Sequence, residues 1–548
     1  MSVETTKPGE RAHDPVAQPG AGTVPSVPSV RPPADSILGP VGPPTGSWPA
    51  RHRYALLALI VTVLTGIQTL NGQWSSDMWE HVAVVRELIA HPFDPNHPLV
   101  LSDAAHPDFS PYTVVLGMVG HLLGVGAVTV LSVAGVVNVV LLLVALRLLV
   151  IEVTGNERAP FWALLFTLAL WGASPYRYSG FYSLNSIGFV APYPSTFATA
   201  VAFGTLVAAL RFARTGERRR LVAVSLGTAV VVLVHPLSAP WFALAMAAVA
   251  LSRQRDLRAI AWFGGVGAVG VGLCLVWPYY PLVDLVNSSA DLESLNQTMY
   301  SSVVPRILPA LLGLAVVVRR SRADHLDLLG LFLAGSAGLY LLGALSDNTS
   351  FGRSLAFVVV VLHIALADGV ARFEAGATLA DASRGARVGV GVIGFLLLVG
   401  LVTTRAGLVR MVPEALLPAS IRGSDELVRP DDRYRFLVGP VGPTEVVAAA
   451  TPSDNRIIPA LTGRSLALAV PRPFVTDADA RKRAQRRFFD PATSAHRRAE
   501  IQDEFQVRFA LLHIDEAGRA LLRILTAGGA TVVHRDDELV LVELAALP

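Results

Sequence analysis

Long apolar runs alternate with short polar segments along this chain, from about residue 54 to residue 404. A helix needs roughly 17 to 25 mostly apolar residues to cross a bilayer. Runs of about this kind predict membrane spans near residues 54–72, 127–150, 159–175, 190–210, 221–235, 238–251, 259–277, 304–318, 327–345, 352–371 and 388–404. The pattern therefore predicts a polytopic α-helical membrane protein with about 11 transmembrane helices.

The positions of arginine indicate which loops face the cytoplasm. Every second loop is basic, whereas the alternate loops, 71–126, 176–189, 278–303 and 346–351, contain only Arg86 and Arg177. Basic residues accumulate in cytoplasmic loops. We therefore expect the N-terminus to be cytoplasmic and the long loop 71–126 to lie outside.

One apolar segment, 112–124, does not fit a full span, because it is short and interrupted by Gly117, Gly120 and His121. Counting it as a span would place every later basic loop on the outer side. We therefore predict a juxtamembrane or re-entrant helix at the outer face.

The composition changes at both ends of the chain. Residues 1–50 are rich in Pro, Gly, Ser and Val and lack an apolar core, which predicts a disordered cytoplasmic tail. The transmembrane domain is expected at 51–411 and a small extracytoplasmic α/β domain at 412–548. In that domain the pattern predicts strands at 434–438, 445–450, 465–470, 506–514 and 531–543, and helices at 476–489, 494–505 and 515–526.

Composition supports a membrane location and excludes several classes of function. The chain is 52% hydrophobic and 16% charged, whereas soluble proteins carry about 25% charged residues. Its net charge of +3 is spread over the loops and forms no nucleic-acid surface. Cys274 is the only cysteine, which excludes disulfides and cysteine-based metal sites. Arginine greatly outnumbers lysine, which suggests a GC-rich bacterial genome and hence a bacterial cytoplasmic membrane.

Candidate chemistry begins in the outer loop, at Ser75-Ser76-Asp77-Met78-Trp79-Glu80-His81. Residues 77–90 have the pattern of an amphipathic helix, and residues three apart share a helix face, so Asp77 and Glu80 are neighbours. One interpretation is structural, with Asp77 capping the helix and Glu80 reaching back as in a capping box. The other is that the two carboxylates face a substrate, and both can hold together.

The rest of this loop favours chemistry, because it adds further acids and histidines, among them Asp103, His106 and Asp108. An acidic pair after the first span, an outer loop with juxtamembrane helices, a Pro-Tyr-led apolar segment ending in Leu-Leu-Gly (111–124) and an outer C-terminal domain resemble the GT-C superfamily of glycosyltransferases. The most similar members transfer mannose or arabinose from polyprenyl phosphate in bacteria. The spacing Asp-x-x-Glu departs from the adjacent acidic pair common in such enzymes.

The resemblance implies a GT-C-type hexosyl- or pentosyltransferase. It would move a sugar from a polyprenyl-phosphate donor to an extracytoplasmic glycan, lipid or protein acceptor. Asp77 is then the candidate base, with Glu80 as its partner. The alternative is a transporter or flippase of lipid-linked saccharides, which should carry ionisable or broken-helix sites near the membrane midplane. The predicted spans are nearly free of such charge, and this asymmetry favours the enzyme.

The leaving phosphate requires a cation, and the best candidate is Arg353, which opens a span at the outer boundary. Its alternative role is an interfacial anchor paired with Asp347. Arg177 is a weaker phosphate candidate, and His235 is either a substrate contact or the end of a helix before Pro236. Tyr193 belongs either to an interfacial aromatic belt or to a sugar-stacking site.

We also place Asp103, His106 and Asp108 among the candidate substrate contacts. Together with Asp77 and Glu80 they offer oxygen and imidazole ligands that could hold a divalent cation. No tight ligand spacing demands a metal, and the sequence indicates no other cofactor.

Overall fold

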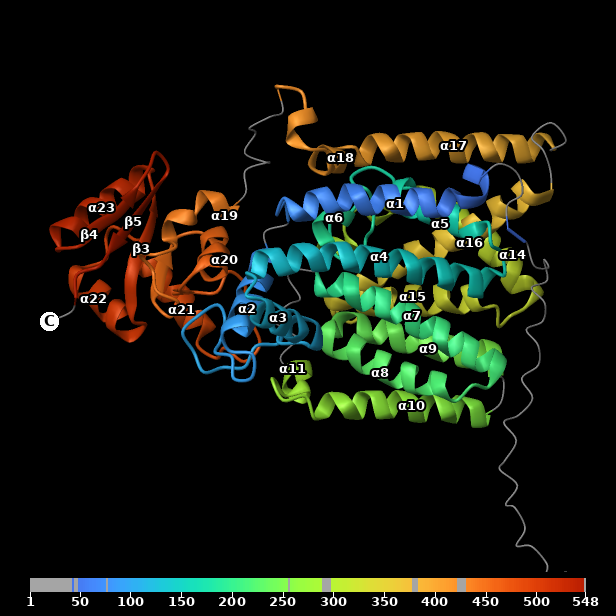
Figure 1. Cartoon of the computed structure of the whole chain (residues 1–548), viewed down its shortest axis with the longest axis horizontal. Coiled ribbons are helices and arrows are strands. Elements are labelled where there is room, and N and C mark those ends of the chain that lie inside the picture. The colour runs from blue at the N-terminus through green and yellow to red at the C-terminus, as the bar shows by residue number, and fades with distance from the viewer. Residues whose placement is uncertain are drawn as a thin grey trace, which may run out of the picture.

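A bundle of long helices carries a small α/β unit at one end (Figure 1). The computed structural model describes residues 42–43, 48–74, 77–254, 257–287, 297–376, 383–420 and 430–546. The tail predicted at 1–50 lies outside the described residues, apart from 42, 43 and 48–50.

Every predicted span coincides with helical structure. The long helices of the bundle are α1 (Trp48–Leu70), α4 (Ala127–Thr154), α7 (Pro194–Thr215), α8 (Arg219–Val234), α9 (Ala239–Gln254), α10 (Leu257–Leu275), α15 (Leu328–Leu345), α16 (Leu355–Gly376) and α17 (Arg384–Thr404). Six of the helices in the described ranges are long and apolar enough to cross a membrane, or seven if α8 and α9, bent by 119° at their junction, count as one span. The protein is therefore a helical membrane protein, and the number eleven stays a prediction.

Two predicted spans are shorter or more broken than the apolar pattern suggested. The segment at 159–175 forms only α5 (Ala159–Ala169), and the chain then continues without helix. The segment at 304–318 is divided into α13 (Val303–Ile307), η4 (Leu308–Leu312) and α14 (Gly313–Ala323). Pro309 accounts for the second break, because proline lacks the N–H that an α-helix requires in its interior.

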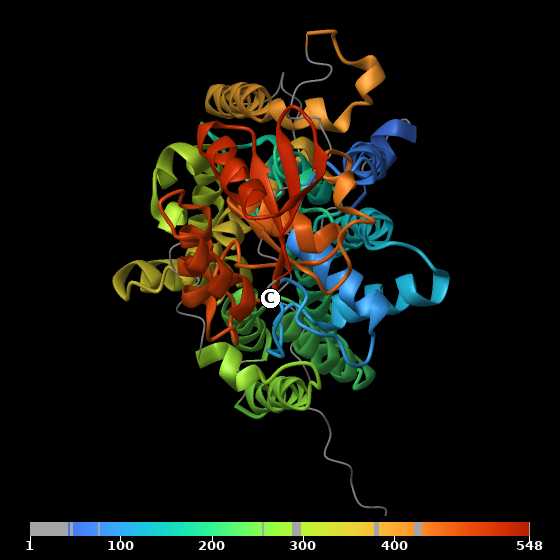
Figure 2. The ribbon, with the colours of Figure 1, turned by 90° about the vertical axis from the view of Figure 1, so that its left-hand side faces the viewer.

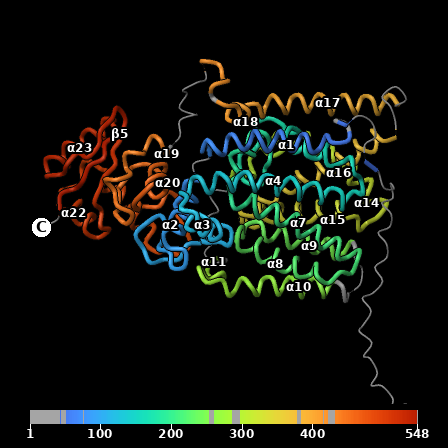
Figure 3. The backbone as a smooth tube through the Cα atoms, in the orientation of Figure 1, coloured from blue at the N-terminus to red at the C-terminus, as the bar shows by residue number. Residues whose placement is uncertain are grey.

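The bundle has a buried centre and lipid-accessible edges. In the apolar window of the span that contains α16, 89% of residues are buried, whereas in the window of α17 only 6% are. Helix α17 runs along one edge of the bundle, and α10 runs along the opposite edge (Figure 3).

Ion pairs join the helices at the end of the bundle away from the α/β unit. Arg53 of α1 pairs with Glu374 of α16 at 2.6 Å. Asp368, also on α16, is fully buried and receives Arg320 at 3.1 Å and Arg372 at 2.9 Å. These carboxylates, one half-buried and one fully buried, are neutralised by arginines, so they help fix the bundle at the end predicted to be cytoplasmic.

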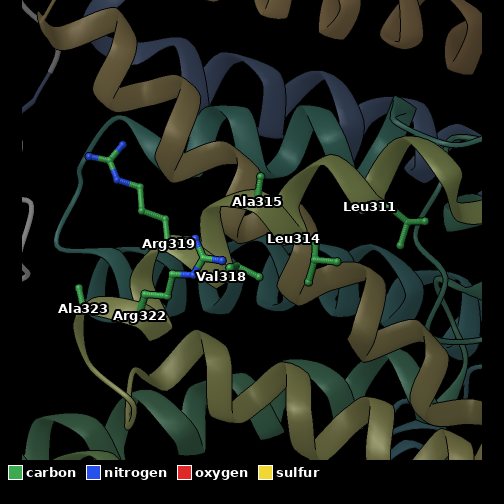
Figure 4. A pocket seen from close by; sticks show the side chains of 7 residues that line it. All are labelled: Leu311, Leu314, Ala315, Val318, Arg319, Arg322 and Ala323. Carbon is green, nitrogen blue, oxygen red and sulfur yellow. The ribbon is translucent and has the colours of Figure 1, made fainter.

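A groove runs along α14 (Figure 4). It is apolar over most of its length and ends at two arginines; its lining is Leu311, Leu314, Ala315, Val318, Arg319, Arg322 and Ala323. None of the residues predicted from the sequence to form the site lines it.

The outer loop lies between the bundle and the α/β unit. It forms α2 (Met78–Ala90) and α3 (Pro111–Leu123), and the latter is the short apolar helix expected at 112–124. Ser110 caps α3 through a reciprocal capping box with Thr113, and Pro111 occupies its first turn. Both helices sit at the end of the bundle against which the α/β unit packs (Figure 1).

The α/β unit contains a five-stranded mixed sheet in the order β2-β1-β3-β5-β4. Its strands are β1 (Val446–Ala449), β2 (Arg464–Ser465), β3 (Val507–His513), β4 (Thr531–Arg535) and β5 (Leu539–Glu543). Strand β1 is parallel to β2 and β3, while β5 is antiparallel to β3 and β4. Seen from this end, the unit lies in front of the bundle (Figure 2).

The helices predicted in this unit are present as α21 (Ala478–Phe489), α22 (Ala495–Glu504) and α23 (Glu516–Ala527). The strand predicted at 434–438 is wrong, because Arg435–Leu437 forms the 3-10 turn η7. A further helix, α20 (Pro452–Leu461), was not predicted, and it contains Pro459 in its interior. Proline argues against a helix in sequence, but Thr451 caps this one and Pro452 suits its first turn.

Candidate functional site

Asp77 is an exposed carboxylate at the N-terminus of α2, and its side chain makes no capping hydrogen bond. It accepts a hydrogen bond from the hydroxyl of Tyr193, the residue that precedes α7. His81, one turn further along α2, meets the ring of Tyr193 edge-on with centroids 5.4 Å apart. The capping interpretation of Asp77 therefore does not describe its side chain, which is held instead by a residue of another helix.

Tyr193 reaches Asp77 because the short helix α6 (Ile187–Val190), just before it, lies against the end of α1. A Cβ atom at Gly188 would lie 1.9 Å from Oε1 of Gln68. A larger residue at position 188 would therefore require the end of the Gln68 side chain to move.

Arg353 supplies a cation beside this carboxylate. It lies in the 3-10 helix η5 (Thr349–Ser354), where its Nη1 donates to Oγ of Ser179 at 3.2 Å. Its guanidinium stacks over the ring of Tyr178 at 5.3 Å and interacts electrostatically with both Asp77 and Tyr193. The structure thus brings together an acid, a tyrosine and an arginine that are far apart in sequence.

His235 joins the same group from the junction between α8 and η1 (Pro236–Ser238). Its Nδ1 lies 2.8 Å from Oγ of Ser238, and its ring interacts electrostatically with Arg353, Asp108 and His81.

Asp108 and His106 approach the site from the loop before α3. Oδ2 of Asp108 lies 3.8 Å from Nδ1 of His81 and 4.0 Å from Nδ1 of His106. Burial alone would raise the pKa of Asp108, but His81, Arg472 and the neighbouring histidines lower it below its ordinary value. Burial lowers the pKa of His106 to about 4, so at neutral pH an ionised Asp108 faces a neutral imidazole.

Glu80 is buried, with 2% of its side chain exposed, and does not reach back to the start of α2. Its carboxylate accepts from Nε of Arg456, on α20, at 2.8 Å and from Nη2 of Arg472. The sequence predicted Glu80 as the partner of Asp77. In the structure its direct partners are two arginines of the C-terminal unit.

A second ion pair joins α2 to the same unit. Glu87 pairs with Arg464 at 2.5 Å, and each side chain is only 4% exposed. Arg86 donates to the carbonyl of Gly463 at 3.1 Å. The helix that carries Asp77 is therefore clamped along one side by the C-terminal unit.

Not every predicted residue joins the cluster around Asp77. Asp103 and Arg177 are both exposed, and their role as substrate contacts stays a prediction. Within the described ranges, no group of three or more His, Cys, Asp or Glu side chains is placed to hold a metal ion. The geometry therefore adds no support for the divalent cation considered from the sequence.

Solved structures share this architecture. ArnT from Cupriavidus metallidurans gives a TM-score of 0.53 at 13% identity, covering 90% of this chain and 98% of that one. The same protein bound to undecaprenyl phosphate gives 0.51 at 12% identity with the same coverage. The arabinofuranosyltransferase AftD from Mycobacteria gives 0.57 at 16% identity, covering 90% of this chain but only 40% of the larger AftD chain.

Comparisons of sequence are less extensive. A family model described as a 6-pyruvoyl-tetrahydropterin synthase related domain, a membrane protein, matches residues 182–319, which is less than half of the chain. No curated protein sequence matches.

ArnT and AftD are both GT-C glycosyltransferases. The prediction from the acidic loop and the outer domain is therefore confirmed at the level of architecture: this chain has the fold of the GT-C membrane glycosyltransferases.

Proposed function

We propose that this protein transfers a sugar from a polyprenyl-phosphate donor to an acceptor hydroxyl at the outer face of a bacterial cytoplasmic membrane. The observation that carries the proposal is the exposed Asp77 carboxylate, held by Tyr193 and flanked by Arg353, at one end of a bundle with the GT-C fold. The undecaprenyl phosphate bound by ArnT supports a lipid-phosphate donor.

In the proposed reaction Asp77 takes the proton of the acceptor hydroxyl as its oxygen attacks the anomeric carbon of the donor. The bond from that carbon to the phosphate oxygen breaks, and the polyprenyl phosphate leaves with the electron pair. Arg353 lies beside Asp77 and stabilises the charge that develops on the leaving phosphate. Its planar fork of N–H groups suits phosphate oxygens better than a lysine would.

The other predicted residues take supporting positions around this pair. Tyr193 orients Asp77, while His235 lies near Arg353 on the donor side. Glu80 fixes α2 against the C-terminal unit. A panel of hexose and pentose donors can identify which class of sugar the protein transfers.

The test is sugar transfer by the purified protein from a panel of radiolabelled polyprenyl-phosphate sugars to a mixed pool of cell-envelope glycans, lipids and proteins. We expect transfer from at least one donor and a roughly 10²- to 10⁴-fold lower rate in Asp77→Asn, which is the typical cost of losing a general base. Because Asp77 makes no side-chain cap, the melting temperature of this variant should change little.

Two outcomes would contradict the proposal. If the wild-type protein transfers no sugar from any donor in the panel, the proposed reaction is wrong. If Asp77→Asn transfers sugar at the normal rate but melts earlier, Asp77 is structural, and Asp108 or Asp103 becomes the next candidate base.

A further inference from the structure

Arg472 reaches the site from the C-terminal unit, in the segment between β2 and α21. It stands between Pro471 and Pro473, which restrict the backbone on both sides. Its Nη2 holds Glu80, while its Nε is buried and has no hydrogen-bond partner in the described part of the chain. One N–H donor of a well-anchored guanidinium is thus left available.

Three more buried polar atoms near Arg472 also have no hydrogen-bond partner among the described residues. Nδ1 of His81, Nε2 of His106 and Oδ2 of Asp108 are buried and, among the residues described, make no hydrogen bond. The His106 side chain is fully buried. Buried polar groups are nearly always hydrogen-bonded in folded proteins. Four exceptions contributed by three separate segments indicate a shared missing partner.

The other three groups lie around Asp108. Arg472 interacts electrostatically with Glu80, Asp108 and Asp77, and Asp108 interacts with both histidines. Together they offer an ionised acceptor, a permanently charged donor and two imidazoles, of which His106 donates through Nε2 because its Nδ1 accepts from the backbone N–H of Asp108. Such a mixture matches hydroxyl groups, because each hydroxyl both donates and accepts.

This cluster differs from the proposed phosphate site in the charge of its surroundings. A phosphate here would meet the carboxylates of Asp77, Glu80 and Asp108, whose repulsion opposes a second anion. Arg353, in contrast, belongs to η5 of the helix bundle and interacts electrostatically with Asp77 from that side. Neutral hydroxyl groups carry no such penalty beside the three carboxylates.

We propose that His81, His106, Asp108 and Arg472 form a subsite for the hydroxyl groups of a carbohydrate acceptor. The inference rests on the proposed glycosyl transfer and names its acceptor class as a glycan. The C-terminal unit then completes the site through Arg472, in addition to packing against it.

The experiment measures the binding of methyl glycosides to the full-length protein in detergent, by saturation-transfer NMR titration. The probes are methyl α-mannopyranoside, methyl α-arabinofuranoside and the fully O-methylated form of each. Arg472→Lys keeps a charge for Glu80 but removes the Nε donor. We expect the wild type to bind a glycoside with free hydroxyls and not its methylated form, and Arg472→Lys to bind it about ten- to a hundredfold more weakly, as for the loss of a hydrogen bond from a charged group.

Arg481→Lys is the matched control. Arg481 also belongs to the C-terminal unit and reaches the outer loop, donating to the carbonyl of Leu101 at 2.8 Å, but it takes no part in the subsite. It should bind the glycoside like the wild type. Absence of glycoside binding, equal binding of the methylated probe, or unchanged affinity in Arg472→Lys would overturn the subsite.

Binding of undecaprenyl phosphate is measured in parallel and should be the same in Arg472→Lys as in the wild type. Weaker undecaprenyl phosphate binding would instead make Arg472 a phosphate ligand and overturn the assignment. Glycoside binding needs no turnover, so a failure of sugar transfer would contradict the proposed function without obscuring this result.

Discussion

The hydroxyl of Tyr193 donates a hydrogen bond to the carboxylate of Asp77 across 116 residues of sequence. This contact joins the residue directly before α2 to the residue directly before α7. It orients a carboxylate that is exposed and has no capping bond of its own. An exposed carboxylate that accepts from a tyrosine hydroxyl can meet an acceptor hydroxyl and still keep a defined direction.

Tyr193→Phe should lower the rate of sugar transfer by about ten- to a hundredfold, because a hydrogen bond to a charged group contributes roughly 1.5–3 kcal/mol. The ring and its packing remain, so the melting temperature should change little. Steady-state transfer assays and thermal melting measure the two effects. Tyr279→Phe is the control, since Tyr279 donates only to the carbonyl of Pro92 at 2.7 Å. An equal loss of rate in both variants would argue against a specific role for Tyr193.

Arg353→Lys should weaken binding of undecaprenyl phosphate while leaving the fold intact. Lysine retains the charge but loses the planar pair of donors that suits phosphate, and it loses the hydrogen bond to Ser179. Scintillation proximity binding with labelled undecaprenyl phosphate measures the change. Arg177→Lys makes the same substitution at an exposed arginine of the neighbouring loop, for comparison. Unchanged affinity in Arg353→Lys at normal expression would return Arg353 to the role of an interfacial anchor.

Local sequence patterns predicted much of the membrane domain because hydrophobic length and arginine placement are visible in single segments. The same patterns singled out Asp77, Asp108 and Arg353 as candidates, since acids and arginines at the ends of apolar runs are conspicuous. They could not show that these residues converge, because convergence depends on how the helices pack.

The role of Glu80 shows most clearly what local sequence patterns could not predict. Its partner Arg472 is 392 residues away, and an ion pair over that separation leaves no local signal. The only hint was an arginine between two prolines in a mostly apolar segment. Helix α20, which supplies Arg456, was missed as well because Pro459 interrupts its pattern.

Glu87→Gln should destabilise the contact between α2 and the C-terminal unit. Its partner Arg464 would remain buried without a countercharge, and removing one partner of a buried ion pair costs about 3–5 kcal/mol. Limited proteolysis should then cleave the C-terminal unit faster, and thermal melting should begin earlier. Glu500→Gln is the control, because its pair with Arg497 is exposed and such pairs contribute about 0–1 kcal/mol. Equal protease resistance of Glu87→Gln and the wild type would show that the pair does not hold the interface.

The same pair should make the interface sensitive to acid. Burial alone would raise the pKa of Glu87, but Arg464, His91 and the backbone of Asn96 hold it below its ordinary value. A carboxyl whose pKa is lower in the folded than in the unfolded protein stabilises the fold at pH values above its unfolded pKa. This stabilisation is lost as the pH falls through its folded pKa. Melting profiles between neutral pH and pH 3 should therefore show the wild type losing its advantage over Glu87→Gln in acid. A constant difference across this range would contradict the ionised pair.

The predicted topology places the C-terminal unit outside the cell and the loop between α7 and α8 inside. Cys274 is buried and is the only cysteine, so a Cys274→Ala background permits labelling of single introduced thiols. Glu516→Cys, at an exposed position at the start of α23, should react with a membrane-impermeant maleimide in intact cells. Arg219→Cys, at a side chain 82% exposed, should react only after permeabilisation. The reverse pattern would place the α/β unit in the cytoplasm and remove Asp77 from the outer face.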